Sequence, residues 1–156
     1  RFKNILQHGD YAEVKKSGGY IIYGRSDATL NPGGVRLGTA EIYSEVEKFK
    51  QVKESIAVGQ SWDNDIRIIL FVILNKGYDL NNDLVKKIKK QIRINASPRH
   101  VPEKIISVTD IPRTKNGKIV ELAVKNTIEG NKIKNKEALA NPEILKEYVN
   151  IKELND

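Results

Sequence analysis

The order of strand-like and helix-like segments predicts an α+β fold, in which a small three-stranded sheet carries packed helices. Residues 67–74 (RIILFVIL) form a near-continuous apolar run, which is typical of a central strand buried on both faces. Residues 82–94 place apolar side chains at helical spacing among lysines, which predicts a helix with one face on the sheet. A short β segment at residues 19–23 (GYIIY) precedes these elements.

The N-terminal half supplies the first strands and the first helix. Residues 1–17 mix polar and apolar positions without a clear period, so we expect a poorly ordered segment there. Thr39 is a good N-cap, and the apolar residues that follow at helical spacing predict a helix: Ile42, Val46 and Phe49. Residues 54–59 (ESIAVG) are rich in β-branched side chains and predict a strand beside residues 67–74.

The helix over residues 82–94 should bury three apolar positions and expose its cations. The buried set is Leu84, Ile88 and Ile92, and the exposed set is Lys86, Lys87, Lys89, Lys90 and Arg93. Pro98 and Pro102 interrupt the chain after it, and residues 104–109 (KIISVT) predict the third strand.

Two further helices are expected in the last third of the sequence. Val120, Val124 and Ile128 lie at helical spacing and Gly130 follows them, which predicts a helix that ends there. Residues 131–140 are polar and lysine-rich, so we expect a flexible connector. The triplet at 141–143, an asparagine, a proline and a glutamate, then predicts the start of a terminal helix that runs to about residue 149.

The composition limits the classes of function. The chain has 156 residues, no cysteine and two histidines, so disulfides and cysteine-ligated zinc are excluded, and any metal should arrive with a ligand. We find no apolar run of about 18 residues and no signal-peptide pattern. The sequence therefore predicts no membrane partner and a cytoplasmic location.

The net charge of +7 suggests an anionic partner. Nucleic acid is disfavoured, because 20 of the 27 basic residues are lysines spread along the chain with few aromatic residues among them. A free-standing module that binds nucleic acid or another polyanion remains the alternative hypothesis. Nucleotides and other phosphorylated small molecules would satisfy the same charge.

Residues 23–41 (YGRSDATLNPGGVRLGTAE) combine a strand end, a charged turn, a glycine loop and a helix start. An arginine, an acid and a glycine pair in one short loop can hold phosphate or ribose groups, since glycines let backbone N–H groups approach a ligand closely. The second motif is residues 111–118 (IPRTKNGK), in which Lys118 follows a glycine and could swing onto an anion. Either motif alone also occurs as a simple turn, and their combination is more specific.

These two motifs together resemble the hinge and the lysine loop of the adenylate-forming enzymes, the family of acyl-CoA synthetases, luciferases and peptide-synthetase adenylation domains. The resemblance covers nearly the whole chain, and residues 26–43 (SDATLNPGGVRLGTAEIY) are most similar to the branch that activates acetoacetate. It implies the C-terminal lid domain of an ATP-dependent acid–thiol ligase that forms an acyl-adenylate and then a CoA thioester. ATP and CoA would be substrates, and Mg²⁺ would arrive with ATP.

The resemblance also implies a division of the chain and a partner. Residues 1–27 would be the remnant of an N-terminal ATP-binding domain and the hinge, residues 28–130 the lid domain, and residues 131–156 a linker and terminal helix. The partner would be the protein's own N-terminal domain. Because the chain begins at Arg1 and contains no methionine, we expect it to be a fragment of that longer protein.

Four residues match family positions that act on the adenylate. Asp10 would bind the ribose hydroxyls, Arg25 the ribose and phosphate, and Arg36 would lie near the phosphates. Lys118 matches the lysine of the adenylation step, whose counterpart in several acyl-CoA synthetases is acetylated as an off switch. A lysine acetyltransferase and a deacetylase are therefore further possible partners.

Three residues match positions that serve the change of pose and CoA. Asp27 matches the hinge, although many relatives carry a second acid where this chain has Ala28. Gly34 matches a glycine that leaves room for the pantetheine arm, and Arg93 falls where some family members bind the CoA phosphates. Arg93 also fits a merely solvated, lysine-rich helix face.

Two further interpretations concern His100 and a possible loss of catalysis. We expect His100, in the stretch SPRHVP, to have no acidic partner in its vicinity, which favours a structural role over a catalytic one. A regulatory domain that kept the fold but lost catalysis is a third hypothesis, and it is disfavoured because Lys118 and Arg25 are retained.

Overall fold

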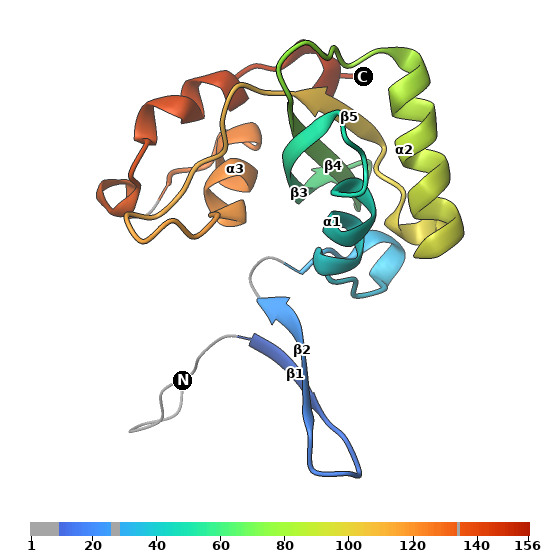
Figure 1. Cartoon of the computed structure of the whole chain (residues 1–156). Coiled ribbons are helices and arrows are strands. Elements are labelled where there is room, and N and C mark those ends of the chain that lie inside the picture. Colours follow the sequence, from blue (N-terminus) through green and yellow to red (C-terminus); the bar gives the residue numbers. More distant parts are fainter. Residues whose placement is uncertain (1–9, 26–28, 134) are drawn as a thin grey trace.

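The computed structural model describes residues 10–25, 29–133 and 135–156 and has the predicted α+β architecture (Figure 1). The three-stranded sheet has the order β3-β4-β5, with β3 at Val52–Trp62, β4 at Asp65–Leu74 and β5 at Lys104–Ser107. β3 and β4 pair antiparallel, whereas β4 and β5 pair parallel. The predicted order of strand, helix, strand, strand, helix and strand is confirmed.

The central strand β4 divides the core into two layers, as its apolar run predicts. Ile68, Leu70 and Val72 belong to one buried cluster, and Ile69, Phe71 and Ile73 belong to the other. Successive side chains of a strand point to opposite faces, so a strand covered on both sides needs an unbroken apolar sequence.

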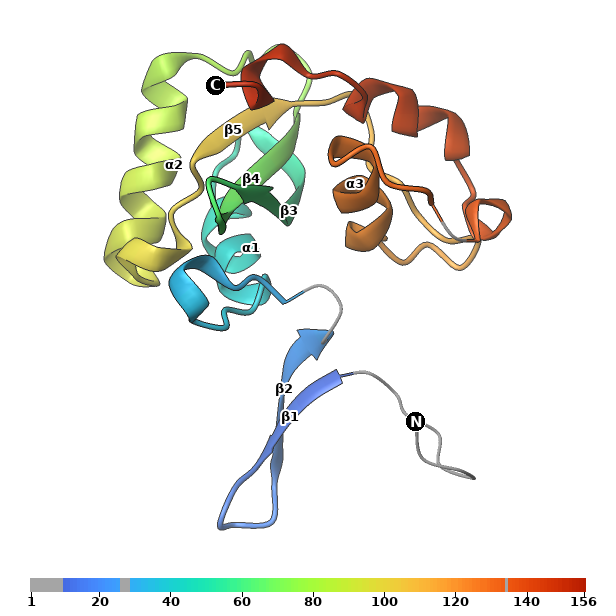
Figure 2. The same cartoon turned by 180° about the vertical axis from the view of Figure 1, so that it is seen from behind.

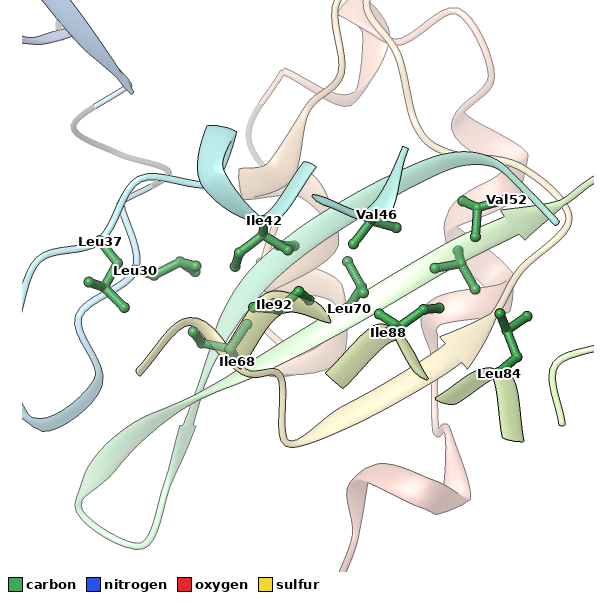
Figure 3. Close-up of a cluster of buried hydrophobic side chains, with 12 residues drawn as sticks. Leu30, Leu37, Ile42, Val46, Val52, Ile68, Leu70, Leu84, Ile88 and Ile92 are labelled. Carbon is green, nitrogen blue, oxygen red and sulfur yellow. The ribbon is translucent and has the colours of Figure 1, made fainter. Parts of the chain in front are cut away.

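Helices α1 (Ala40–Val46) and α2 (Asn82–Asn95) cover the first layer. Figure 3 shows Ile42 and Val46 of α1 and Ile88 and Ile92 of α2 gathered over Leu70 and Ile68. The predicted buried face of α2 is confirmed residue by residue: Leu84, Ile88 and Ile92. The Asn81 side chain caps α2 by accepting the N–H of Leu84 at 2.9 Å.

The opposite layer is covered by α3 (Glu121–Ile128) and by the C-terminal segment, which lie together on the far side of the sheet from α1 and α2 (Figure 2). The predicted terminal helix is the 3₁₀ helix η4 (Pro142–Tyr148). Tyr148 is fully buried, and its hydroxyl donates a hydrogen bond to the Asp110 carbonyl at 2.8 Å. Burial and the neighbouring Glu147 and Asp110 carboxylates raise the pKa of this phenol.

The expectation of a poorly ordered N-terminal segment is wrong for residues 10–17. Strand β1 (Asp10–Val14) pairs antiparallel with β2 (Tyr20–Arg25), and this hairpin lies beneath the rest of the domain in Figure 1. Val14 and Tyr20 are 64% and 73% exposed. An exposed strand held by backbone pairing carries no strong hydrophobic period, so periodicity did not reveal it.

The expectation of a flexible connector at residues 131–140 is also wrong at its C-terminal end. Leu139 is buried beside Ala123 and Leu145, and the short 3₁₀ helix η3 (Lys136–Ala138) precedes it. Ala138 and Ala140, on either side of Leu139, form backbone hydrogen bonds with the lysine loop. Within the described residues, no helix has the length and apolar character needed to cross a bilayer.

Candidate functional site

The glycine loop is a short 3₁₀ turn, η1 (Pro32–Gly34), closed at its base by the bridge between Leu30 and Leu37. Leu30 is fully buried and so anchors the loop in the core. Gly33 and Gly34 have φ angles of +57° and +75°, a region that L side chains rarely adopt. A Cβ atom on Gly34 would meet nothing within 4 Å, so this position opens to space on the domain side.

Asp65 fastens the glycine loop to the turn between β3 and β4. Its two carboxylate oxygens accept the N–H of Gly33 at 2.9 and 3.0 Å. These bonds favour the ionised form, and the backbone N–H groups of Ile66 and Gly33 hold the pKa of Asp65 below its ordinary value.

A polar cleft of about 570 Å³ lies between the glycine loop and the β3–β4 turn. It is lined by Asn31, Gly34, Ser61, Trp62, Asp63, Asn64, Asp65 and Ile66. Trp62 is 39% exposed, and the guanidinium of Arg67 lies 3.7 Å from the centroid of its ring. The cleft therefore has both the glycine turn and the Trp62 side chain among its walls.

The lysine loop is a hydrogen-bonded hairpin closed by the bridge between Arg113 and Ile119. The N–H of Thr114 donates to the Lys118 carbonyl at 2.8 Å, and the Thr114 hydroxyl accepts the N–H of Lys118 at 3.1 Å. Arg113 pairs with Glu54 of β3 and donates to the Gly117 carbonyl at 3.2 Å. The backbone of Lys118 is thus ordered, while its side chain is exposed and its ammonium has no partner among the residues that the structure describes.

The glycine loop and the lysine hairpin lie at separate ends of the domain in both views (Figures 1 and 2). The glycine loop lies below α1, and the lysine hairpin lies beside α3. The domain therefore has two distinct faces, each with one of the two motifs.

The β1–β2 hairpin brings two predicted adenylate-binding residues together. Asp10 and Arg25 are directly opposed in the strand register, which the sequence could not show because 14 residues separate them. Their predicted roles depend on side chains that the structure does not describe. Asp27, the predicted hinge, lies outside the described residues.

Two further predicted residues, Arg36 and Arg93, are exposed. Arg36 follows the glycine loop, and Arg93 lies in the last turn of α2. The structure adds Arg99, whose guanidinium is 3.7 Å from the position of a Cβ atom on Gly33. No local sequence pattern indicates Arg99, because the contact joins residues that are far apart in the chain.

The interpretation that His100 lacks an acidic partner is wrong. Its Nε2 lies 3.1 Å from the Glu41 carboxylate of α1, and its Nδ1 lies 2.8 Å from the Ser97 hydroxyl. His100 is buried, so these bonds satisfy a core histidine and join α1 to the turn η2 (Pro98–His100). Within the described part of the chain, no cluster of His, Cys, Asp or Glu could hold a metal ion.

Comparison with known proteins places this geometry among adenylate-forming enzymes. The family model described as AMP-binding enzyme C-terminal domain matches residues 41–118. The acetoacetyl-coenzyme A synthetase of Rhizobium meliloti (strain 1021) is 58% identical over 154 residues, which cover 99% of this chain and 24% of that protein. The acetoacetyl-CoA synthetase of Gallus gallus is 46% identical over 156 residues, covering 99% of this chain and 23% of that protein.

A solved structure shows the same arrangement. Acetoacetyl-CoA synthetase from Streptomyces lividans matches with a TM-score of 0.83 and 36% identity, over 96% of this chain and 23% of that one. The present chain thus spans about a quarter of the length of the relatives that it matches.

Proposed function

The chain belongs to the AMP-binding enzyme C-terminal domain family, and from that membership we propose that it is the lid domain of an ATP-dependent acid–thiol ligase acting on acetoacetate. The observation that carries the proposal is the match of nearly the whole chain, at 58% identity, to an acetoacetyl-coenzyme A synthetase. Because the chain spans about a quarter of that relative, the remaining part would supply the N-terminal ATP-binding domain as its partner.

The proposed reaction has two steps. In the first, an oxygen of the acetoacetate carboxylate attacks the α-phosphorus of ATP, and diphosphate leaves to give the acyl-adenylate. In the second, the CoA thiolate attacks the carbonyl carbon, and AMP leaves to give acetoacetyl-CoA. The first step brings anion against anion, so it needs positive charge near the reacting phosphate.

Lys118 would supply that charge. Its exposed ammonium is a compact point charge that can approach phosphate oxygens once the lid closes, and its ordered hairpin backbone limits how far the side chain must be reorganised. Asp10 and Arg25, opposed in the β1–β2 ladder, would bind the ribose and phosphate of the adenylate, with Arg36 near the phosphates.

The second step would use the other face of the domain. Gly34, beside the polar cleft, would leave room for the pantetheine arm, and Arg93 on α2 would bind CoA phosphates. Rotation about Asp27 would exchange the two faces at the active site. That the lysine hairpin and glycine loop lie at separate ends of the domain supports such an exchange, because one pose could present only one of them.

The proposal extends to Mg²⁺ and to the location of the protein in the cell. Mg²⁺ would enter with ATP, since the described residues offer no ligand cluster of their own. We propose a cytoplasmic location. The nucleic-acid module is not favoured, because the family match and the relatives account for the basic charge through phosphorylated substrates.

The full-length protein tests the proposal. Acid-dependent exchange of diphosphate into ATP, measured with acetoacetate, acetate and butyrate, should show the highest kcat/KM with acetoacetate. Exchange that did not depend on any acid, together with tight and steeply salt-dependent RNA binding by residues 1–156, would contradict it and favour the polyanion-binding module.

A further inference from the structure

The outer edge of the lysine hairpin is paired with residues 138–140. Ala140 donates its N–H to the Arg113 carbonyl at 2.8 Å, and Lys115 donates its N–H to the Ala138 carbonyl at 3.2 Å. Thr114 and Leu139 form an antiparallel bridge, while Thr114 bonds to Lys118 on the inner edge. Residues 113–115 are therefore the middle of three short antiparallel segments.

Asn141 holds the base of the same hairpin. Its Oδ1 accepts the N–H of Arg113 at 2.9 Å, and its Nδ2 donates to the Asp110 carboxylate at 2.7 Å and to the Ile111 carbonyl at 3.0 Å. Both ends of one half-buried amide are thus bonded to the segment that leads into the lysine loop. A neutral side chain that satisfies a donor and two acceptors fixes their relative positions.

The position of Asn141 is in turn fixed by the core. It precedes η4, whose Leu145 and Tyr148 are buried. The Tyr148 ring packs edge-on against Phe71 of β4, with centroids 4.9 Å apart and an interplanar angle of 73°. Thr109, two residues after the end of β5, bonds to the Glu147 carboxylate. Residues 138–148 are therefore attached to the core and to the start of the lysine loop at several points.

We propose that Asn141 is a positioning residue for Lys118, and that residues 138–148 act as a clamp that holds the lysine hairpin in shape for adenylation. The inference rests on the proposed function, because it assigns to Asn141 an effect on the step that Lys118 serves. Asn141 would touch neither ATP nor CoA. Its effect is geometric: a shift of about 1 Å in a positioning group can slow a reaction by about 10²-fold.

The test compares Asn141→Ala with the matched variant Asn126→Ala in the full-length protein. Asn126 lies on α3 and makes none of the side-chain bonds to the hairpin. Three quantities are measured: diphosphate exchange, thioester formation from supplied acyl-adenylate, and hydrogen exchange at the amides of Gly117 and Lys118. We expect Asn141→Ala to slow adenylation by about 10- to 100-fold, to leave thioester formation unchanged and to speed amide exchange, whereas Asn126→Ala resembles the wild type.

Asn141→Ser keeps a hydroxyl that can accept the N–H of Arg113, so its adenylation rate should lie between the rates of the wild type and of Asn141→Ala. If the alanine variant fails to fold, the serine variant alone should show slower adenylation than the wild type. Equal loss of both steps in the serine and alanine variants would assign Asn141 a merely structural role and overturn the proposal. Normal adenylation in Asn141→Ala, alongside slow adenylation in Lys118→Ala, would overturn it while the proposed function stands. Normal adenylation in Lys118→Ala would instead defeat the proposed role of Lys118, and this inference with it.

Discussion

The backbone N–H of Gly33 donates to both carboxylate oxygens of Asp65, at 2.9 and 3.0 Å, across 32 positions of sequence. The glycine loop is thereby tied to the turn between β3 and β4, next to the polar cleft that Gly34 lines. The conformation of the loop on the proposed CoA face thus depends on a charged hydrogen bond.

The charge on Asp65 makes this tie sensitive to acid. Because the Ile66 and Gly33 N–H groups lower the pKa of Asp65 in the folded state, its stabilising contribution is present above the ordinary aspartate pKa of about 3.9 and is lost as the pH falls through the lowered folded value. We expect the amide signal of Gly33, followed by NMR from neutral pH downward, to stay constant and then move at acidic pH.

Asp65→Asn should remove this titration, and the neighbouring variant Asp63→Asn should keep it. Asp63 is a suitable control because it lies in the same turn with a φ of +47°, which asparagine tolerates. A Gly33 signal that titrates unchanged in Asp65→Asn would show that another group controls the loop.

The sequence predicted the parts of the fold that depend on strong local patterns. The unbroken apolar run of β4 indicated a strand covered on both faces, and the spacing of Leu84, Ile88 and Ile92 indicated the buried face of α2. In both cases burial imposes a period on consecutive residues, and that period is visible without knowledge of the partner.

The features that the sequence could not predict depend on distant pairing. Strand β1 is stabilised by backbone bonds to β2, which leave its side chains free to be polar. His100 bonds to Glu41, which is 59 positions away in the sequence. Asn141 bonds to the lysine hairpin although α3 separates them in the sequence. Each of these contacts joins residues that are distant in the sequence, so only the fold brings the partners together.

Residues 1–156 alone should have no ligase activity. The proposed ATP pocket needs surfaces from two domains, and correct positioning of reactants supplies about 7–11 kcal/mol of barrier reduction in favourable cases. The measurement is acetoacetate-dependent release of diphosphate by the purified 156-residue chain, with the full-length protein as the positive control. Release by the isolated chain at a comparable rate would contradict its assignment as a lid.

Lys118→Ala should slow adenylate formation by on the order of 10²–10³, the effect of losing one donor that acts in the transition state. Thioester formation from supplied acyl-adenylate should stay nearly normal. Lys115→Ala is the matched control, because Lys115 is an exposed lysine of the same hairpin whose backbone, and not its side chain, makes the described bond.

Acetylation of Lys118 in the full-length protein should reproduce the alanine phenotype, since it removes the charge of the ammonium. Deacetylation should restore adenylation. An acetylated enzyme that kept its adenylation rate would show that this ammonium does not serve the first step.

Gly34 offers the complementary test on the opposite face. Its φ of +75° means that Gly34→Ala should destabilise the domain by about 1–2 kcal/mol, the penalty of a Cβ atom in the left-handed region, whereas Gly34→Asn should be tolerated better, because asparagine adopts that region more readily. If the glycine serves only the turn, the asparagine variant should therefore have higher activity than the alanine variant in both half-reactions.

The proposed CoA passage predicts another order. Since the domain itself leaves the space beside Gly34 open, a side chain there would project toward the bound pantetheine arm, and the larger asparagine should block it more than alanine does. Both variants should then keep adenylation, since the lysine hairpin lies at the other end of the domain, and thioester formation should fall further in Gly34→Asn than in Gly34→Ala. Rapid-mixing measurements of the two half-reactions, with a melting curve for each variant, separate the two orders. If thioester formation were faster in the better-folded Gly34→Asn than in Gly34→Ala, Gly34 would serve only the conformation of the turn.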